Sequence, residues 1–568
     1  MTRKALSKTI NTVLIAAVSV CMFSGCSSKD NSIAVEESSI EMTEEDMEAS
    51  EEMDKEQQID PVLNNYVFTP LITEESIYGG ANSENGGTSY TIRYQSAILD
   101  EQTAEVYPKL SETLIKDKDI QMKGSDESLE AFKETASFIM DNSAYAGMEL
   151  TDEILTSVVR ADHAVLSLKK EGYWFNAGAH GFYHTVGVNY DPESGERLKL
   201  NDVVNDTDQL IAAAGTKLNE AYPEGLSGID RLAEIINTAS DKVYGEEGFD
   251  SGFGWTIGYN QLELYFNPYT LGSYAEGQQI IKLNFSDYPE LFNEKYTKNI
   301  PDAYLYKINS HEDIVYEDID NDGKNEAVKI SMLLDGNGLE YTDEYILEVS
   351  FEDKTYSTSF YSFQGYENYF VKDSDGSCYV YSFTQHDNDY VVLDICKITK
   401  EGLIVSNAGN LEPAVISYDY IDSEECEPGE YLTNFHSLGY ALTNPRKLKL
   451  SSRLDALSTY NGYRNYTLNE DGFPVSDNPF IVDSGKVLKL KKDFELEECY
   501  QNGKRRGIKQ VLPEGTELYI HLTDGLNYVV LRYETDKYVY AEIDVNEYPQ
   551  LINGESSEDV LDGMFYAG

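Results

Sequence analysis

Alternating carboxylates in the middle of the chain form the strongest candidate for a binding site. Residues 318–326 read Asp-Ile-Asp-Asn-Asp-Gly-Lys-Asn-Glu and come directly before an apolar run typical of a β-strand. Carboxylates at alternate positions of a loop that turns at a glycine can direct their oxygens at one hard cation, as Ca²⁺ requires. The loop differs from an EF-hand, because Lys329 occupies the twelfth position, where a bidentate glutamate would stand. We predict a calcium site, with a metal-free turn as the alternative; its ligands would be Asp318, Asp320, Asp322 and Glu326.

Motifs for catalysis are weak elsewhere in the chain. His180 and His184 have a spacing that suits a metal on a helix, but the surrounding glycine and aromatic residues favour a strand or loop and a structural role. Ser167 and Lys170 match S-x-x-K without the companion motifs of penicillin-binding enzymes. We therefore predict no catalytic residue, although a carboxylate pair for glycoside hydrolysis stays open in so acidic a chain.

The first 26 residues have the pattern of an export signal. Arg3, Lys4 and Lys8 precede an apolar stretch, residues 13–23, which is too short to cross the roughly 30 Å hydrocarbon core of a membrane as a helix. The stretch ends in Phe-Ser-Gly-Cys26, which resembles the lipobox of bacterial lipoproteins. The resemblance implies that Cys26 is acylated and anchors the chain at the extracytoplasmic face of the cell membrane. An ordinary signal peptide, cut elsewhere, is the alternative.

An acidic segment follows Cys26. Between Glu36 and Asp60 the chain has twelve Asp or Glu against one basic residue, Lys55, and no aromatic residue. Such a segment cannot bury enough apolar surface to offset the entropy of ordering, and its charges repel one another. We expect residues 27–88 to form a disordered tether.

Size and charge restrict the partners of the folded part. The chain has 568 residues, of which 41% are hydrophobic, so it is long enough for several domains. The net charge is −57, far more than the tether alone supplies. Nucleic acid would be repelled, whereas basic proteins and metal ions would be attracted. The alternative is that the acidity only keeps an exported protein soluble.

Four cysteines follow the signal segment: Cys378, Cys396, Cys426 and Cys499. They have neither C-x-x-C spacing nor interleaved histidines, so we do not expect a zinc site. One disulfide and unpaired buried thiols both remain open.

Residues 89–170 and 171–298 each mix helix and strand patterns. In the first range we expect a strand at 89–94, helical spacing at 101–116 and 128–140, and a strand at 155–168. Pro108 should start the first helix or bend it. In the second range we expect a hairpin over 186–204, helices at 207–222 and 229–243, and strands at 255–257, 261–266 and 279–283. These patterns indicate two adjacent α+β domains.

Two motifs in this region resemble a known family. The first contains Tyr173, Gly178, Ala179, His180, Asn189, Asp191, Gly195, Leu198, Leu200 and Asp202; the second contains Leu264, Phe266, Tyr269, Tyr274, Ala275 and Gly277. They resemble the extracytoplasmic domain of RsiV-type anti-sigma factors and the paired domains before the catalytic domain of PdaC-type peptidoglycan deacetylases. The resemblance covers roughly residues 90–293. It implies an α/β sensor-type fold, which in the RsiV branch binds lysozyme.

The remainder of the chain has β patterns throughout. Short strand patterns recur at regular spacing in residues 299–455, which contain the Asp-rich loop and suggest a sandwich, a barrel or part of a propeller. Residues 456–568 resemble a small SH3-like barrel. The predicted fold class is therefore α+β and multidomain, with an RsiV-like unit followed by all-β domains.

The sequence favours a binding or sensing protein of the cell envelope that is not an enzyme. Its expected partners are the membrane, through the lipid, and either lysozyme or peptidoglycan, and its one possible cofactor is Ca²⁺. An accessory enzyme of cell-wall maintenance and a structural adhesin are the alternatives.

Overall fold

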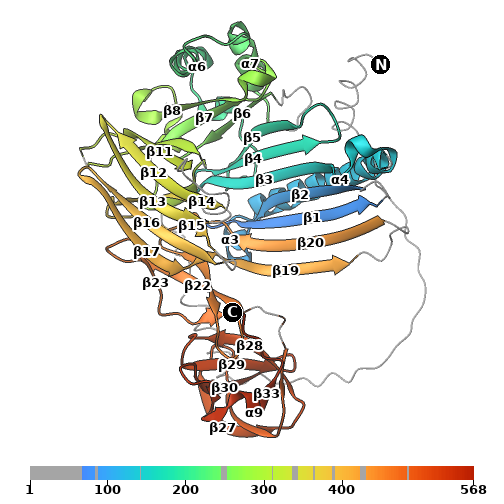
Figure 1. Ribbon diagram of the computed structural model, residues 1–568. Coiled ribbons are helices and arrows are strands. Elements are labelled where there is room, and N and C mark those ends of the chain that lie inside the picture. The colour runs from blue at the N-terminus through green and yellow to red at the C-terminus, as the bar shows by residue number, and fades with distance from the viewer. Residues whose placement is uncertain are drawn as a thin grey trace.

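The computed structural model describes residues 67–82, 87–140, 142–244, 252–309, 311–320, 322–334, 343–362, 365–386, 390–422, 430–482, 485 and 487–567. The chain is mostly β-sheet, with several sheets, multiple domains and an all-β C-terminal region, and it is α+β overall (Figure 1). None of the helices in these ranges is long and apolar enough to span a membrane.

A seven-stranded sheet organises the N-terminal part. Its order is β19-β20-β1-β2-β3-β4-β5, and β2 and β3 run parallel. A parallel pair needs a crossover, which is supplied by α3 and the long helix α4, packed on one face of the sheet (Figure 1). The bounds are β1 (Leu71–Ala81), β2 (Thr88–Ile98), α3 (Glu101–Val106), α4 (Pro108–Ile139), β3 (Glu149–Ala161), β4 (Leu166–Phe175), β5 (Phe182–Tyr190), β19 (Val415–Asp422) and β20 (Glu430–Tyr440).

The two helical patterns at 101–116 and 128–140 belong mainly to one helix. Pro108 starts α4 at its first turn, where its missing N–H costs nothing, so the helix begins there as predicted. Leu110, Leu114, Phe132 and Ala136 are buried against the sheet. Alternation of buried residues along β2 puts Tyr90, Ile92 and Tyr94 on the face that α4 covers.

The fold includes residues that the sequence assigned to the tether. Val67 bridges Asp162, and β1 pairs along its whole length with β2 and β20. Leu71 and Ala81 are buried at the two ends of β1, and Ile77 packs between them against the core under α4, which brings the strand into the fold. The prediction of disorder for 27–88 is therefore wrong for residues 67–82 and 87–88. Residues 1–66, with Cys26, lie outside the described residues.

A second unit has its own core. The three-stranded sheet β6-β7-β8 is covered by α6 and α7, and leucine, isoleucine and phenylalanine side chains fill the space between them. The bounds are α5 (Leu200–Val203), α6 (Thr207–Ala221), α7 (Leu232–Ala239), β6 (Phe253–Ile257), β7 (Gln261–Phe266), β8 (Gln279–Asn284) and α8 (Glu294–Thr297). The expected boundary at 170/171 falls inside β4, because β4 and β5 complete the seven-stranded sheet and do not join this unit.

Two further sheets pack face to face on a shared core. One has the order β10-β11-β12-β13, the other β17-β16-β15-β14-β9, and both contribute to the core around Val328, Val349, Phe370 and Val380. The bounds are β9 (Tyr304–Lys307), β10 (Glu312–Glu317), β11 (Glu326–Leu334), β12 (Asp343–Phe351), β13 (Lys354–Ser362), β14 (Tyr366–Lys372), β15 (Cys378–Gln385), β16 (Val391–Thr399) and β17 (Gly402–Asn410). The expected domain 299–455 is not self-contained, because β19 and β20 leave it for the first sheet.

The last strands of the chain form a lobe of their own, whereas Leu448, Leu450 and Tyr466 of the same sheet pack on the face-to-face sheets (Figure 1). Its sheet already begins with β18 and β21, before the expected start at residue 456. The bounds are β18 (Glu412–Pro413), β21 (Leu448–Leu454), β22 (Tyr460–Leu468), β23 (Pro474–Val475), β24 (Phe480–Ile481), β25 (Val487–Leu490), β26 (Phe494–Cys499), β27 (Arg505–Leu512), β28 (Glu517–Thr523), β29 (Tyr528–Tyr533), β30 (Lys537–Asp544), β31 (Leu551–Ile552), β32 (Glu555–Ser556), α9 (Ser557–Val560) and β33 (Leu561–Asp562).

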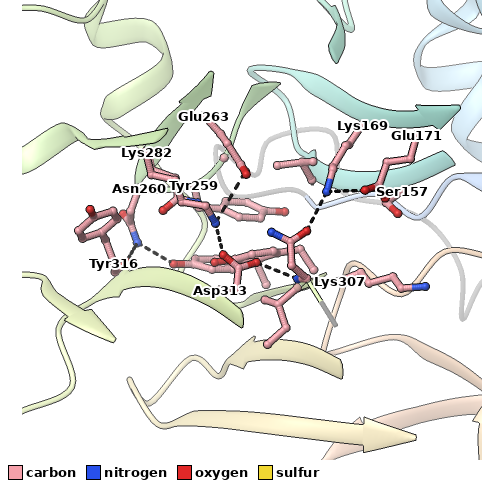
Figure 2. Close-up of a pocket in the computed structure, with 17 residues that line it drawn as sticks. Ser157, Lys169, Glu171, Tyr259, Asn260, Glu263, Lys282, Lys307, Asp313 and Tyr316 are labelled. Atoms are coloured by element: carbon pink, nitrogen blue, oxygen red, sulfur yellow. Dashed lines mark hydrogen bonds and ion pairs between the residues drawn. The ribbon is translucent and has the colours of Figure 1, made fainter. Parts of the chain in front are cut away.

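A small cavity lies where three of these parts meet. Strands β3 and β4, the sheet β6-β7-β8 and strands β9 and β10 all contribute side chains to its walls (Figure 2). It encloses about 90 Å³ and is lined by charged, amide and tyrosine side chains. Its residues come from segments far apart in the sequence.

Candidate functional site

The Asp-rich loop joins two paired strands. Glu317 at the end of β10 pairs with Glu326 at the start of β11, so residues 318–325 must turn back within a short loop. The turn brings all four predicted ligands together: one carboxylate oxygen from each of Asp318, Asp320, Asp322 and Glu326 lies within 4.8 Å of the others. An all-oxygen set of this kind fits a hard cation such as Ca²⁺.

Backbone N–H groups hold the carboxylates in place. Asp318 accepts hydrogen bonds from the N–H of Asp322 at 3.0 Å and of Gly323 at 2.9 Å. Gly323 has φ +90°, a conformation that a residue with a Cβ adopts only with strain. Asp320 also accepts from the N–H of Asp322, at 3.1 Å. The loop is therefore ordered by its own Asx turns, and the convergence of carboxylates follows from the turn.

The pKa of Glu326 is affected by burial and by the three aspartates around it. Partial burial raises the pKa of this carboxyl, and the charges of Asp320, Asp318 and Asp322 raise it further, against a lowering hydrogen bond from the N–H of Ile319 at 2.8 Å. A cation among the four groups would remove this repulsion.

The raised pKa predicts how stability depends on pH when no divalent cation is present. When the pKa of a carboxyl is higher in the folded state than in the unfolded state, its contribution to stability is fully present at a pH below the pKa of the unfolded state. This contribution is lost as the pH rises through the pKa of the folded state. We expect wild-type protein in EGTA to lose melting temperature relative to Glu326→Gln as pH rises through that range. Melting curves of both proteins across pH, in EGTA, measure the difference; a constant difference would contradict the prediction.

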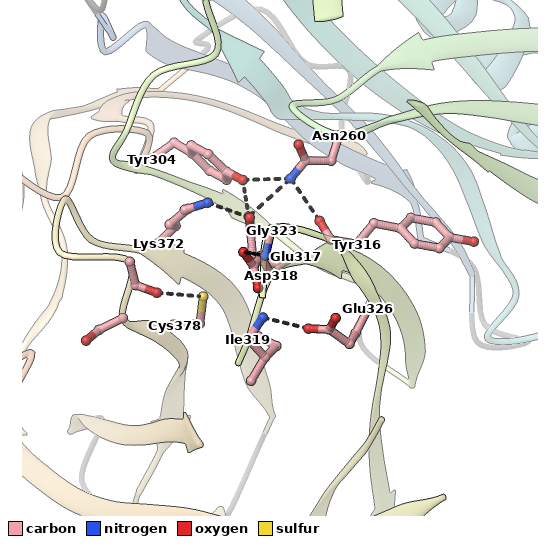
Figure 3. A network of polar contacts seen from close by, with 12 residues as sticks. Asn260, Tyr304, Tyr316, Glu317, Asp318, Ile319, Gly323, Glu326, Lys372 and Cys378 are labelled. Atoms are coloured by element: carbon pink, nitrogen blue, oxygen red, sulfur yellow. Dashed lines mark hydrogen bonds and ion pairs between the residues drawn. The ribbon is translucent and has the colours of Figure 1, made fainter. Parts of the chain in front are cut away.

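A buried network lies directly behind the loop (Figure 3). Glu317 is 1% exposed and accepts hydrogen bonds from Lys372 Nζ at 2.5 Å, from Asn260 Nδ2 at 3.1 Å and from the Tyr304 hydroxyl. Asn260 also donates to the Tyr316 carbonyl at 2.8 Å. Asn260 and Tyr304 line the cavity as well, so the loop and the cavity share one wall. The sequence did not single out Glu317, because its partners lie on strands distant in the chain.

The family-motif residues fall into two groups. At one end of the hairpin β4–β5, His180 stacks on Tyr274 with ring centroids 3.9 Å apart, and the Tyr274 hydroxyl donates to the Gly181 carbonyl at 2.8 Å. The Tyr269 hydroxyl lies 3.5 Å from His180 Nε2. We call the group Tyr173, His180, Tyr183, Tyr269 and Tyr274 the aromatic surface.

The aromatic surface is accessible and strained. Tyr269 is 56% exposed and Tyr173 39% exposed. Tyr269 has φ +72°, which is uncommon for a bulky residue and costs on the order of 1–3 kcal/mol. Gly178 lies in the exposed turn between the two strands. Backbone strain of this kind is frequent at binding sites, so Tyr269 is a candidate contact residue.

Asp191 and Gly195 occupy the opposite end of β5 and support the turn there. Asp191 accepts from the N–H of Ser194 at 2.8 Å and pairs with Lys295. Gly195 has φ +69°, and a Cβ there would lie 2.5 Å from the Lys109 carbonyl oxygen of α4. These two motif residues position elements and do not join the aromatic surface.

The weaker motifs do not assemble a site. Ser167 and Lys170 are three residues apart on β4, so their side chains project from opposite faces. The Ser167 hydroxyl donates a hydrogen bond to Asn189 Oδ1 at 2.6 Å, and Lys170 Nζ donates to Gln121 Oε1 at 2.6 Å. His184 lies within β5, stacked on Phe182, where burial lowers its pKa. His180 lies in the turn before β5.

The cysteines in the described ranges are unpaired. Cys378, Cys396 and Cys499 are buried thiols whose pKa burial raises, to about 12 for Cys396 and Cys499. Cys426 lies outside the described residues. Buried thiols with a raised pKa are unreactive, so we assign them to packing.

Comparison with known proteins gives structural neighbours only. A scan against protein-family models gave no match, and a search of curated proteins found no relative. One similar solved structure, a DUF3298 family protein from Pseudomonas aeruginosa, is 12% identical and aligns over 41% of this chain and 98% of its own, with a TM-score of 0.26. Another, a DUF3298 member from Bacteroides fragilis, is 16% identical and aligns over 40% and 95%, with a TM-score of 0.27. Both neighbours belong to the DUF3298 family, a domain of unknown function.

Proposed function

We propose that this chain is a lipid-anchored binding or sensing protein of the bacterial cell envelope, without catalytic activity, and that its aromatic surface engages a basic protein such as lysozyme. The lipobox-like end of the signal segment, at Cys26, supports the compartment. The observation that carries the binding role is Tyr269, an exposed aromatic residue in a strained conformation beside His180.

The chemistry of the aromatic surface suits a protein partner. Tyrosine rings offer apolar contact area and a hydroxyl, and they lose little conformational entropy on binding. Residues of this type are frequent among those that dominate binding energy at interfaces. The acidic remainder of the chain, with a net charge of −57, would accelerate encounter with a cationic partner.

A pull-down on immobilised lysozyme tests this proposal. We expect the full-length wild-type chain to be retained at low salt and released at about 1 M salt, where the screening length falls to about 3 Å. Tyr269→Ala should reduce retention about tenfold or more, as expected for a central aromatic contact.

Tyr418→Ala is the matched control, because Tyr418 is 68% exposed but lies on β19, at the opposite edge of the same sheet. Absence of retention at low salt would exclude lysozyme as the partner. An equal loss of retention in Tyr269→Ala and Tyr418→Ala would show that the aromatic surface is not the binding site. Binding to isolated peptidoglycan instead would identify a wall component, and release of sugar or acetate from it would favour the accessory enzyme.

We also propose that the Asp-rich loop binds Ca²⁺ through Asp318, Asp320, Asp322 and Glu326. Support comes from the convergence of the four carboxylates within 4.8 Å and from the raised pKa of Glu326, which marks repulsion that a cation would relieve. The ion would stabilise the loop and, through Glu317, the wall that the loop shares with the cavity.

A further inference from the structure

Four charged side chains meet in the cavity, each from a different strand. They are Lys169 of β4, Glu263 of β7, Lys282 of β8 and Asp313 of β10 (Figure 2). Their side chains are at most 10% exposed. Burying a charge costs several kcal/mol unless good partners compensate it, so the pairing of these groups decides what the cavity can accept.

Three of the four groups are well paired. Lys282 contacts the carboxylate of Asp313 and donates to the Ile314 carbonyl at 3.1 Å. Lys169 donates to Asn309 Oδ1 at 2.8 Å and lies 3.0 Å from Glu171. Asp313 also accepts from the N–H of Asn309 at 2.8 Å.

Glu263 is the exception. Lys282 Nζ lies 3.7 Å from its Oε2, which is too long for a hydrogen bond, and its Oε1 has no hydrogen-bond partner in the described part of the chain. Gln261 lies two residues earlier on the same face of β7, and its Oε1 is likewise unpartnered. The two residues are only 6% and 5% exposed. The cavity therefore holds two adjacent buried acceptors that require a donor.

The surroundings of Glu263 favour a positively charged donor. Lys282 lies between the carboxylates of Asp313 and Glu263, and burial raises the pKa of the Glu263 carboxyl more than the ammonium groups of Lys282 and Lys169 lower it. A bound cation would favour the charged form of Glu263. The rings of Tyr259 and Tyr304, stacked with centroids 3.8 Å apart, form part of the same wall. The volume, about 90 Å³, is smaller than the roughly 150 Å³ that holds a benzene molecule, so it suits a head group.

We propose that this cavity binds a primary ammonium group, with Glu263 Oε1 and Gln261 Oε1 as its acceptors. An ammonium offers three N–H donors, enough for both oxygens, and its charge would offset the cost of burying the Glu263 carboxylate. The ligand is a small amine, or the amine terminus of a longer molecule that leaves through the mouth of the cavity. This site is separate from the aromatic surface and does not depend on it.

Isothermal titration of the full-length chain with ethylammonium chloride, in an amine-free buffer, tests the proposal. We expect saturable binding of ethylammonium and none of ethanol or acetate, which have similar size but lack the charge or reverse it. Glu263→Gln keeps the shape and removes the charge, and should weaken binding by about tenfold or more. Glu367→Gln is the control, because Glu367 pairs with cavity-lining Lys307 but is 47% exposed.

A second variant keeps the proposal testable if Glu263→Gln fails to fold. Gln261→Met removes one acceptor without changing charge, and should weaken ethylammonium binding while the fold, followed by circular dichroism, is retained. Absence of saturable heat with the wild type would show that the cavity holds water only and would overturn the proposal. Equal binding of ethanol, or unchanged affinity in the folded variants, would overturn it too. Retention on lysozyme should be unaffected by either variant, which separates this test from that of the proposed function.

Discussion

Replacement of Arg160 by methionine is expected to lower the free energy of unfolding of the N-terminal part by about 3–5 kcal/mol. Arg160 is fully buried, and its Nε donates to Asp162 Oδ2 at 2.7 Å. Its Nη1 donates to the carbonyls of Gly258 at 3.0 Å and Tyr296 at 2.7 Å, which belong to the second unit. The substitution leaves the buried carboxylate of Asp162 without its cation and two carbonyls without a donor, and methionine restores only packing.

Tryptophan fluorescence during denaturant unfolding measures this loss. Trp255 lies in β6, three residues before Gly258, and reports on this contact, whereas Trp174 lies at the far end of β4 from Arg160. Arg446→Met is the control, because Arg446 forms an ion pair with Asp302 at 2.8 Å in which both side chains are about half exposed, and such pairs contribute about 0–1 kcal/mol.

The double variant Arg160→Met with Asp162→Asn supplies a further check. It should be less destabilised than the sum of the single changes, because asparagine leaves no buried charge behind. A loss no larger than that of Arg446→Met would contradict the importance of the buried pair.

Calcium is expected to raise the melting temperature of the wild-type protein, and EGTA to reverse the effect. A ligand that binds only the folded state stabilises it by about 2.7 kcal/mol at 100 times its dissociation constant. Calorimetric scans at increasing Ca²⁺ concentration measure the shift. Asp320→Asn should require a much higher Ca²⁺ concentration for the same shift, because the amide oxygen is a neutral ligand, although it can still accept from the N–H of Asp322.

Asp375→Asn is the matched control for Asp320. Asp375 also accepts a backbone N–H, that of Ser377 at 2.8 Å, in an exposed turn. Its substitution should leave the calcium response unchanged. Identical wild-type melting curves in Ca²⁺ and EGTA would exclude a stabilising ion at the loop, whatever the pH dependence of Glu326.

Local features were predictable because they depend on neighbours in the chain. The start of α4 at Pro108 follows from the fixed φ of proline and its missing donor. The convergence of Asp318, Asp320 and Asp322 depends on a turn at Gly323 and on hydrogen bonds within six residues. Periodicity also located helix α6 closely, since its apolar face is encoded by residues three and four apart.

Long-range pairing was not predictable. The β1–β20 ladder joins Leu71 to Tyr440, and nothing in either strand specifies a partner so distant in the sequence. The acidic composition ends at residue 60, but Glu74 and Glu75 interrupt the apolar pattern of β1, so the sequence did not distinguish this strand from the tether. The cavity was even harder to predict than the β1–β20 ladder. Within their own strands, Lys169, Glu263 and Asp313 each resemble ordinary surface charges.

By itself, the sequence determined the turn that gathers Asp318, Asp320, Asp322 and Glu326, and the position of helix α6, because short-range geometry fixes both. Only the tertiary structure decided which motif residues form a surface, with Tyr269 beside His180 and Asp191 at the far end of β5. It also decided that Gln261 Oε1 and Glu263 Oε1 would be buried without a hydrogen-bond partner among the described residues, since burial depends on the packing of three sheets against one another. The sequence fixes which polar groups are present, but contacts between distant segments decide which of them are desolvated. Desolvation strengthens hydrogen bonds and makes an unpaired polar group costly.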